Sequence, residues 1–233
     1  MPASLHSCRI GSDGARWRTG RVENSFATKP CSVAMKSITC YYQLASTTMD
    51  PCTMTKSFRT EARRTWLCER CGHPLERHSF DLSIQEDRPD NTPLNMAYGC
   101  RVGIARKEFL FAFGEDIVLQ DLYLGNLYGP DGCLLKDWVT FVGHHQIIVR
   151  GSKDAAYRRC SQCGKNIYFA MDDLYLYPQP ARSVSMFDAG SGCLVVTDKL
   201  IGRVKLNKWQ KLECKKLPVL NTPKDGFVEL ISV

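Results

Sequence analysis

Two short cysteine motifs constrain this chain more than any other feature. Residues 68–72 are Cys-Glu-Arg-Cys-Gly, and residues 160–164 are Cys-Ser-Gln-Cys-Gly. The Cys-x-x-Cys spacing lets two thiolates from one tight turn reach the same metal, and glycine permits the positive φ that turns backbone N–H groups toward the sulfurs. Two such knuckles supply four thiolates, which form the closed tetrahedral shell of a structural zinc site. The sequence therefore predicts one structural Zn²⁺ bound by Cys68, Cys71, Cys160 and Cys163.

Composition limits the number of domains and the cellular compartment that are compatible with this sequence. Its 233 residues, 44% of them hydrophobic, suffice for one large domain or two small ones. The twelve cysteines would suit a secreted disulfide framework, but residues 1–30 are basic and polar and lack the apolar core of a secretory leader. No apolar run approaches the roughly eighteen residues of a membrane-spanning helix. We expect a reducing, cytoplasmic compartment. Four cysteines near the N-terminus have no knuckle spacing and are expected to be free thiols: Cys8, Cys31, Cys40 and Cys52.

The chain divides by composition into an extension and a domain. Residues 1–36 are rich in Ser, Thr, Arg and Gly and are predicted to be a disordered or mis-annotated N-terminal extension. Translation could begin at Met1 or at one of three later methionines: Met35, Met49 or Met54. Residues 37–233 are predicted to form a single zinc-ribbon-containing α+β domain, although residues up to 60 show little apolar periodicity. A minimal zinc ribbon needs far fewer residues between its two knuckles than this chain has. Residues 73–159 are therefore predicted to be an insertion between the two halves of the ribbon.

Alternating and apolar segments predict a β-rich fold. Phe80, Leu82 and Ile84 alternate with polar residues, which indicates a half-buried strand. The apolar run at residues 105–113 is too short to distinguish a helix from a buried strand. Further strands are predicted at residues 37–44, 117–119, 122–125, 138–142, 146–150, 166–170 and 174–177, with the last four forming two pairs in chain order. The predicted fold class is α+β, mostly antiparallel β, with a zinc-ribbon-like two-knuckle site and a C-terminal β-α-β segment.

The C-terminal β-α-β segment is also the most basic part of the chain. It is predicted as a buried strand at residues 193–196, a short amphipathic helix at 199–209 capped by Thr197 or Asp198, and an edge strand at 212–219. Its basic side chains are Lys199, Arg203, Lys205, Lys208, Lys211, Lys215 and Lys216. They form either a solvated face or a surface for an acidic partner.

Several other residues have the chemistry of ligands or catalysts. His73 and His78 lie close enough to the first knuckle to be spare ligands, but four cysteines already complete a zinc shell. His144 and His145 would point to opposite faces of a strand, so a solvated turn pair is favoured over a shared metal, and their role stays open. Four acids occur among turns and strand ends without an acid–base partner: Asp116, Asp121, Asp131 and Asp137. No catalytic residue is predicted.

The layout resembles the double-CXXCG families of bacterial proteins, some of which are assigned as immunity proteins of contact-delivered toxins. The resemblance is carried by the two knuckles, by the aromatic hairpin after the second, and by the tail Gly192-Cys193-Leu194-Val195-Val196-Thr197-Asp198-Lys199-Leu200. It covers about residues 38–220, and the segment Met1–Pro30 does not fit the family layout. The resemblance implies a toxin-neutralising binder that contains zinc-ribbon knuckles.

Three functions agree with these patterns. The favoured one is a non-enzymatic zinc-binding protein that binds a partner protein, such as a toxin, and occludes its active or binding surface. The first alternative is a zinc-ribbon nucleic-acid-binding protein, favoured by the net charge of +7, although the positive excess lies in residues 1–60 and 151–233. The second alternative is a thiol redox enzyme that uses a Cys-x-x-Cys pair. A catalytic zinc usually keeps an open position, whereas four cysteines close the shell.

Overall fold

The computed structural model describes only part of the chain. The described residues are 40–48, 51–145, 147, 158–167, 175–176, 184–190 and 192–219. All of them belong to one compact unit, residues 38–233. The predicted extension, residues 1–36, lies outside the described residues. No helix in the described part has the length and apolar content needed to cross a bilayer.

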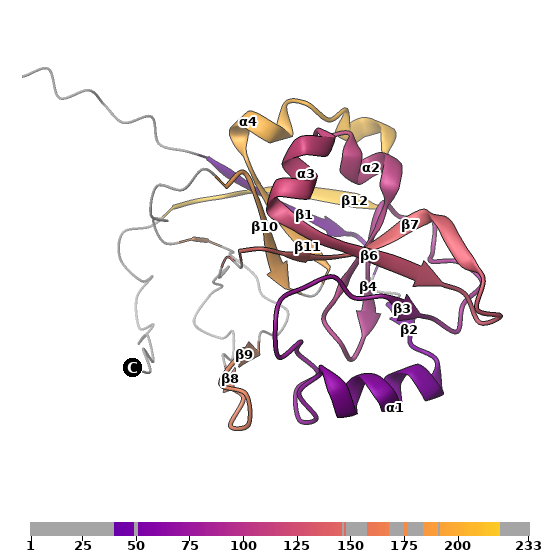
Figure 1. The fold of residues 1–233 in the computed structure, drawn as a ribbon. Helices are drawn as coiled ribbons and strands as arrows, with labels where there is room; N and C mark the ends of the chain where they lie inside the picture. Colours follow the sequence, from indigo (N-terminus) through magenta and orange to yellow (C-terminus); the bar gives the residue numbers. More distant parts are fainter. Residues whose placement is uncertain are drawn as a thin grey trace, which may run out of the picture. The chain divides into compact units, whose positions relative to one another are not determined.

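A six-stranded sheet is built mainly from strands of the segment between the knuckles (Figure 1). Its order is β2 (Cys52–Thr53), β4 (Leu94–Tyr98), β5 (Gly103–Arg106), β7 (Leu134–Gly143), β6 (Leu122–Tyr128) and β3 (Leu82–Ser83). The four central strands pair antiparallel, whereas β2 and β3 pair parallel to their neighbours at the two edges. Five of the six strands therefore come from between the two cysteine motifs.

A four-stranded sheet joins the beginning of the described chain to its end. Its order is β10 (Met186–Gly190), β11 (Cys193–Thr197), β1 (Tyr41–Ser46) and β12 (Leu212–Leu217), and all of its pairs are antiparallel. Because β11 and β12 both run antiparallel to β1, they are parallel to each other. They are connected by α4 (Asp198–Ile201) and the 3₁₀ helix η1 (Leu206–Lys208). The predicted C-terminal β-α-β segment is thus present, with β1 lying between its strands.

The two faces of the six-stranded sheet cover different cores. Along β5, Ala105 contacts one buried cluster and Ile104 the other, as the two-residue period of a strand requires. The first cluster also contains β1, β11, α2 (Lys107–Phe111), α3 (Glu115–Asp121) and α4, and these three helices gather at the top of Figure 1. The second cluster contains Ala62 of α1 (Lys56–Thr65) and Leu67, which precedes the first knuckle. This second core therefore supports the first knuckle.

Several local predictions are confirmed. Phe80, Leu82 and Ile84 are buried and alternate with exposed or half-buried residues. The strand predicted at residues 122–125 lies within β6, and the first predicted strand overlaps β1. The ambiguous run 105–113 divides at residue 106, where β5 ends and α2 begins. The fold class is α+β with mostly antiparallel strands, as predicted.

Other local predictions are wrong. Residues 117–119 lie in helix α3 instead of a strand, and the buried residues of this helix, Val118 and Asp121, are three positions apart, which is a helical period. The predicted helix at 199–209 ends at Ile201 and is followed by a separate 3₁₀ turn. Helix α1 was not predicted, because Ala62 is its one fully buried residue and leaves hardly any apolar pattern.

Two predicted strand pairs involve residues outside the described part. Residues 138–142 lie in β7, but β7 pairs with β5 and β6, and Ile147 is the one described residue of the predicted partner 146–150. Asn166–Ile167 forms β9, which pairs with β8 (Arg158–Arg159). Most of the predicted hairpin at residues 166–177 lies outside the described residues.

Candidate metal centre

The first knuckle is a tight hairpin that follows α1. Leu67 and Pro74 form an antiparallel bridge across its base. Inside the turn, the N–H of Cys68 donates to the carbonyl of His73 at 2.9 Å, and the N–H of Gly72 donates to the carbonyl of Cys68 at 2.8 Å. Gly72 has a φ of 70°, which is favourable for glycine and costly for other residues. The turn brings Cys68 and Cys71 to the same side.

The second knuckle repeats this geometry. The N–H of Cys160 donates to the carbonyl of Lys165 at 2.9 Å, and the N–H of Gly164 donates to the carbonyl of Cys160 at 2.8 Å. Gly164 has a φ of 71°. The short strands β8 and β9 pair at the base of the turn, in the same position as the Leu67–Pro74 bridge of the first knuckle. Both Cys-x-x-Cys-Gly motifs therefore fold into the turn that their spacing predicts.

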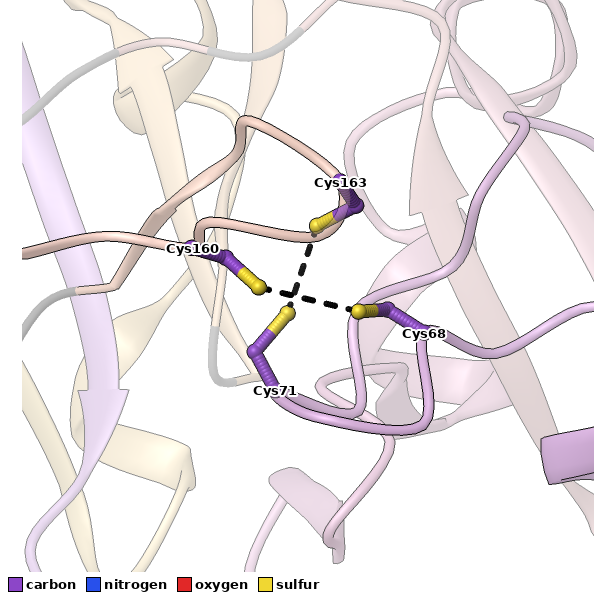
Figure 2. Close-up of side chains that lie close together, drawn as sticks. All are labelled: Cys68, Cys71, Cys160 and Cys163. Atoms are coloured by element: carbon purple, nitrogen blue, oxygen red, sulfur yellow. Dashed lines mark hydrogen bonds between the residues drawn. The ribbon is translucent and has the colours of Figure 1, made fainter.

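The two knuckles bring their sulfurs together in a compact group (Figure 2). Cys68 Sγ lies 3.7 Å from Cys160 Sγ, and Cys71 Sγ lies 3.4 Å from Cys163 Sγ. All four sulfurs lie within 4.8 Å of one another. A tetrahedron with Zn–S bonds of about 2.3 Å has S···S edges of about 3.8 Å, whereas a disulfide bond is about 2.05 Å long. The arrangement therefore fits a four-thiolate metal site and not a pair of disulfides.

Polar contacts with the sulfurs come from both knuckles. The Nδ1 atom of His73 lies 3.3 Å from Cys71 Sγ, and Cys68 Sγ lies 3.6 Å from Oε1 of Gln162. The N–H groups of Cys163 and Gln162 lower the pKa of Cys160 to about 6. Donors that point toward a sulfur stabilise its thiolate, which is the form that binds metal.

Burial has the opposite effect on two of the cysteines. It raises the pKa of Cys71 and of Cys163, since an apolar setting penalises a charged sulfur. A thiolate in such a position needs a cation close by, and a bound metal ion would provide it. Cys71 and Cys163 are therefore suited to a metal-bound state more than to a free thiolate state.

Two basic side chains connect the knuckles directly. Arg70 of the first knuckle donates from Nη1 to Ser161 Oγ of the second at 2.7 Å. In the reverse direction, Nζ of Lys165 donates to the carbonyls of Pro74 and, at 3.1 Å, of Leu75. Each knuckle therefore extends one cationic side chain to the other.

A small cleft of about 20 Å³ lies beside the centre. Its lining residues are His73, Pro74, Arg77, Arg101, Val142, Lys165 and Asp188. Arg77 pairs with Asp188 at 3.3 Å and also donates to the carbonyl of Gly143. Burial and the positive charges of Arg101, Lys165 and Arg77 lower the pKa of His73 to about 4, so His73 is neutral at physiological pH. The volume has room for one or two water molecules and no more.

Other residues that the sequence offered as ligands or catalysts contact neighbouring side chains or backbone and do not join the sulfur group. The ring of His78 packs against Phe80 in a tilted arrangement with centroids 3.9 Å apart, and His144 packs against Tyr123 in the same way at the same separation. His144 and His145 lie in a bend after β7, as the turn prediction expected. Buried Asp121 accepts N–H groups of Ser185 and Met186 at 2.9 Å. Among the described residues, the four cysteines are the group of metal-ligating side chains that the fold brings together.

Three residues of the centre were not predicted from the sequence. Arg70 lies between two ligands and Lys165 directly follows the second knuckle, but a lysine or arginine at a turn is too common to indicate a contact. Gly99 is in contact with the first knuckle, since a Cβ at Gly72 would overlap its carbonyl oxygen. The positive φ of 84° at Gly99 gives no sequence signal beyond the glycine itself.

Comparisons with known proteins do not assign this centre. No protein-family model matches the chain, and a search of curated proteins finds no match. The functional argument therefore depends on the residues of this chain.

Proposed function

We propose that Cys68, Cys71, Cys160 and Cys163 hold one structural Zn²⁺, and that this non-enzymatic, cytoplasmic protein acts by binding a partner protein. The observation that carries the metal proposal is the mutual approach of all four sulfurs to within 4.8 Å. Four thiolates at tetrahedral spacing are the donor set that zinc prefers in structural sites.

A closed shell argues for a structural role of the metal. A catalytic zinc has three protein ligands and an open position for water or substrate, and its ligands usually include His or a carboxylate. Here four cysteines already complete the tetrahedron, and the neighbouring His73 contacts a sulfur through Nδ1 instead of joining the group. The centre thus supports a clamp more than a reaction site.

The clamp would join two distant parts of the chain. Cys68 and Cys160 are 92 positions apart in the sequence. Closing a loop of this length costs conformational entropy, and a metal bound by both ends offsets that cost. The second knuckle would in this way be held against the core that supports the first knuckle.

The exposed basic tail supports an acidic partner surface. All seven basic side chains predicted there are exposed: Lys199, Arg203, Lys205, Lys208, Lys211, Lys215 and Lys216. Such a concentration of positive charge steers association with a negatively charged surface. The resemblance to double-CXXCG immunity proteins extends the proposal to a toxin as the partner, which the tail would occlude.

The metal proposal is tested by metal analysis of protein purified without chelator. Wild type is expected to contain about one zinc per chain, and Cys68→Ser/Cys160→Ser is expected to contain none. The matched control is Cys133→Ser/Cys214→Ser, which removes two exposed cysteines outside the centre and should retain the metal. Wild type without metal, or full zinc content in the ligand variant, would refute the proposal.

The partner proposal is tested by comparing charge-reversed variants. A partner captured by tagged wild type should be released by Lys205→Glu/Lys208→Glu, because its acidic surface would be repelled. Lys136→Glu changes an exposed lysine of β7 and should keep the partner. Equal capture by all three proteins would exclude the tail as the binding surface.

A nucleic-acid ligand is the second candidate, and helix α1 favours it. This helix contains four basic residues and a single acid, Glu61, and its last turn is formed with Arg63 and Arg64. If α1 contacts phosphates, retention on immobilised DNA or RNA should fall steeply with salt and should weaken in Arg63→Glu/Arg64→Glu. Lack of retention at low salt would remove this candidate.

A further inference from the structure

The proposed metal centre creates an electrostatic problem that the surrounding protein must solve. Zinc with four thiolates has two net negative charges. Two of the sulfurs belong to buried residues, since Cys68 and Cys160 are 1% and 2% exposed. Burying this charge without compensation is costly, so cations or N–H donors are expected around it.

Lys165 is placed to supply one of these cations. It directly follows Gly164 of the second knuckle, and its half-buried side chain crosses to the first knuckle. There its Nζ atom donates to the carbonyls of Pro74 and Leu75. Its side chain also lines the cleft beside the centre together with His73, whose Nδ1 atom lies 3.3 Å from Cys71 Sγ. Lys165 thus lies beside the sulfur group while holding the backbone of the first knuckle.

The neighbouring charged groups are already engaged elsewhere or are less directly connected. Arg77 forms an ion pair with Asp188, and the two charges cancel. Arg70 is directed to Ser161 at the exposed side of the knuckles. The Nδ1 atom of His73 lies 3.3 Å from Cys71 Sγ, where it would donate its N–H to the sulfur, because a metal-bound sulfur only accepts hydrogen bonds. Arg101 lines the cleft beside Lys165 and supplies a second positive charge.

We propose that Lys165 is the counter-ion of the tetrathiolate centre and, at the same time, the latch that fastens the second knuckle to the first. This inference rests on the proposed zinc site. With metal bound, the charge of Lys165 offsets part of the negative charge of the centre, while Arg77 is paired with Asp188.

Removing the charge of Lys165 should weaken metal binding. Changes in groups that support metal ligands typically lower metal affinity by about 10–100-fold. Lys165→Met keeps the length of the side chain but removes its charge and its donors, so we expect a loss in this range in competition with a chromophoric chelator. The matched control is Lys215→Met, because Lys215 is exposed and pairs with Glu213 on the same strand. This control should bind zinc like wild type.

Cobalt substitution separates the charge of Lys165 from its latch contacts. A nearby cation stabilises the sulfur electrons, so its removal should lower the energy of the thiolate-to-Co²⁺ charge-transfer band. We expect Lys165→Met to shift this band to longer wavelength, and Lys165→Arg, which retains the charge, to absorb close to the wild-type position. Both variants are first checked for cooperative unfolding, and Lys165→Arg keeps the test valid if Lys165→Met does not fold.

The outcomes distinguish this inference from the zinc proposal. Wild type that binds no metal overturns the zinc proposal and the inference with it. Wild type that binds zinc, together with unchanged affinity and spectrum in Lys165→Met, overturns the counter-ion role alone. A loss of affinity with an unshifted band in Lys165→Met also overturns the counter-ion role and leaves Lys165 as a mechanical latch.

Discussion

The two knuckles have the same turn but different support. In each, the first cysteine donates its N–H to the residue five positions later, and a glycine with φ near 70° closes the turn. The first knuckle rests on a packed core: Leu67 is 2% exposed, Trp66 stacks on Phe80 at 4.2 Å, and Gly72 contacts the backbone of Gly99. Its position is determined by packing as well as by its cysteines.

The second knuckle has far fewer contacts in the described part of the chain. Its base is the two-residue pair β8–β9, and Ser161 and Gln162 at its tip are exposed. Among the described residues it contacts the first knuckle through the sulfur group, the approach of Gln162 Oε1 to Cys68 Sγ, the Arg70–Ser161 hydrogen bond and the Lys165 latch. We therefore expect the first knuckle to be held in place by the core and the second knuckle to depend on the proposed metal.

The largest expected effect comes from removing the metal with a strong chelator. We expect the second knuckle to lose its structure, because thiolates brought together without a cation repel each other, while the first knuckle remains on its core. Hydrogen exchange checks this: protection of the Gly164 amide should fall by a factor of about 100 or more, and that of the Gly72 amide far less. Restored protection after zinc is added back is the control. An equal loss of amide protection at Gly72 and Gly164 would contradict the expectation that only the second knuckle depends on the metal.

Substituting the two knuckle glycines should separate strain from packing. Gly72→Ala adds left-handed strain and an overlap with Gly99, for a combined loss of about 3 kcal/mol in the free energy of unfolding. Gly164→Ala has the same φ penalty, and we expect a loss of about 1 kcal/mol. Denaturant unfolding of the zinc-loaded proteins measures both. A Gly164→Ala loss equal to or greater than that of Gly72→Ala would show that the second knuckle is packed as tightly as the first.

Shortening Trp66 should weaken the support of the first knuckle and leave metal stoichiometry unchanged. Its ring stacks on Phe80 and contacts Phe58, so Trp66→Ala should lower the free energy of unfolding by about 2 kcal/mol. Zinc content measured on the same sample should stay near that of wild type. Loss of zinc in this variant would mean that the core positions the sulfurs directly.

The smallest effect is expected from the exposed contact between the knuckles. Arg70→Ala removes the hydrogen bond to Ser161, and exposed pairs of this kind contribute below about 1 kcal/mol. Thermal unfolding of Arg70→Ala and Ser161→Ala should give nearly equal small shifts, since each removes the same bond. A large shift in one of them alone would indicate a further contact of that residue.

Local patterns predicted the parts of the fold that depend on neighbouring residues. The turn geometry of both motifs follows from Cys-x-x-Cys-Gly spacing, and the burial of Phe80, Leu82 and Ile84 follows from strand alternation. Helix α3 was missed because a short apolar run has the same composition in a helix and in a strand. Strand partners were missed as well: β7 lies between β5 and β6, and no local pattern encodes that pairing.

The sequence by itself determined the four sulfur donors and the two turns that present them, because both depend on spacings of a few residues. The tertiary structure brings these turns together across 92 positions, as a shared four-thiolate site requires. Only the tertiary structure decided that the core supports one of them and that Lys165 crosses between them. The physical reason is the separation along the sequence over which each interaction acts, since φ preferences and hydrogen bonds within a turn involve only near neighbours. The meeting of two distant knuckles depends on how two sheets and their cores pack.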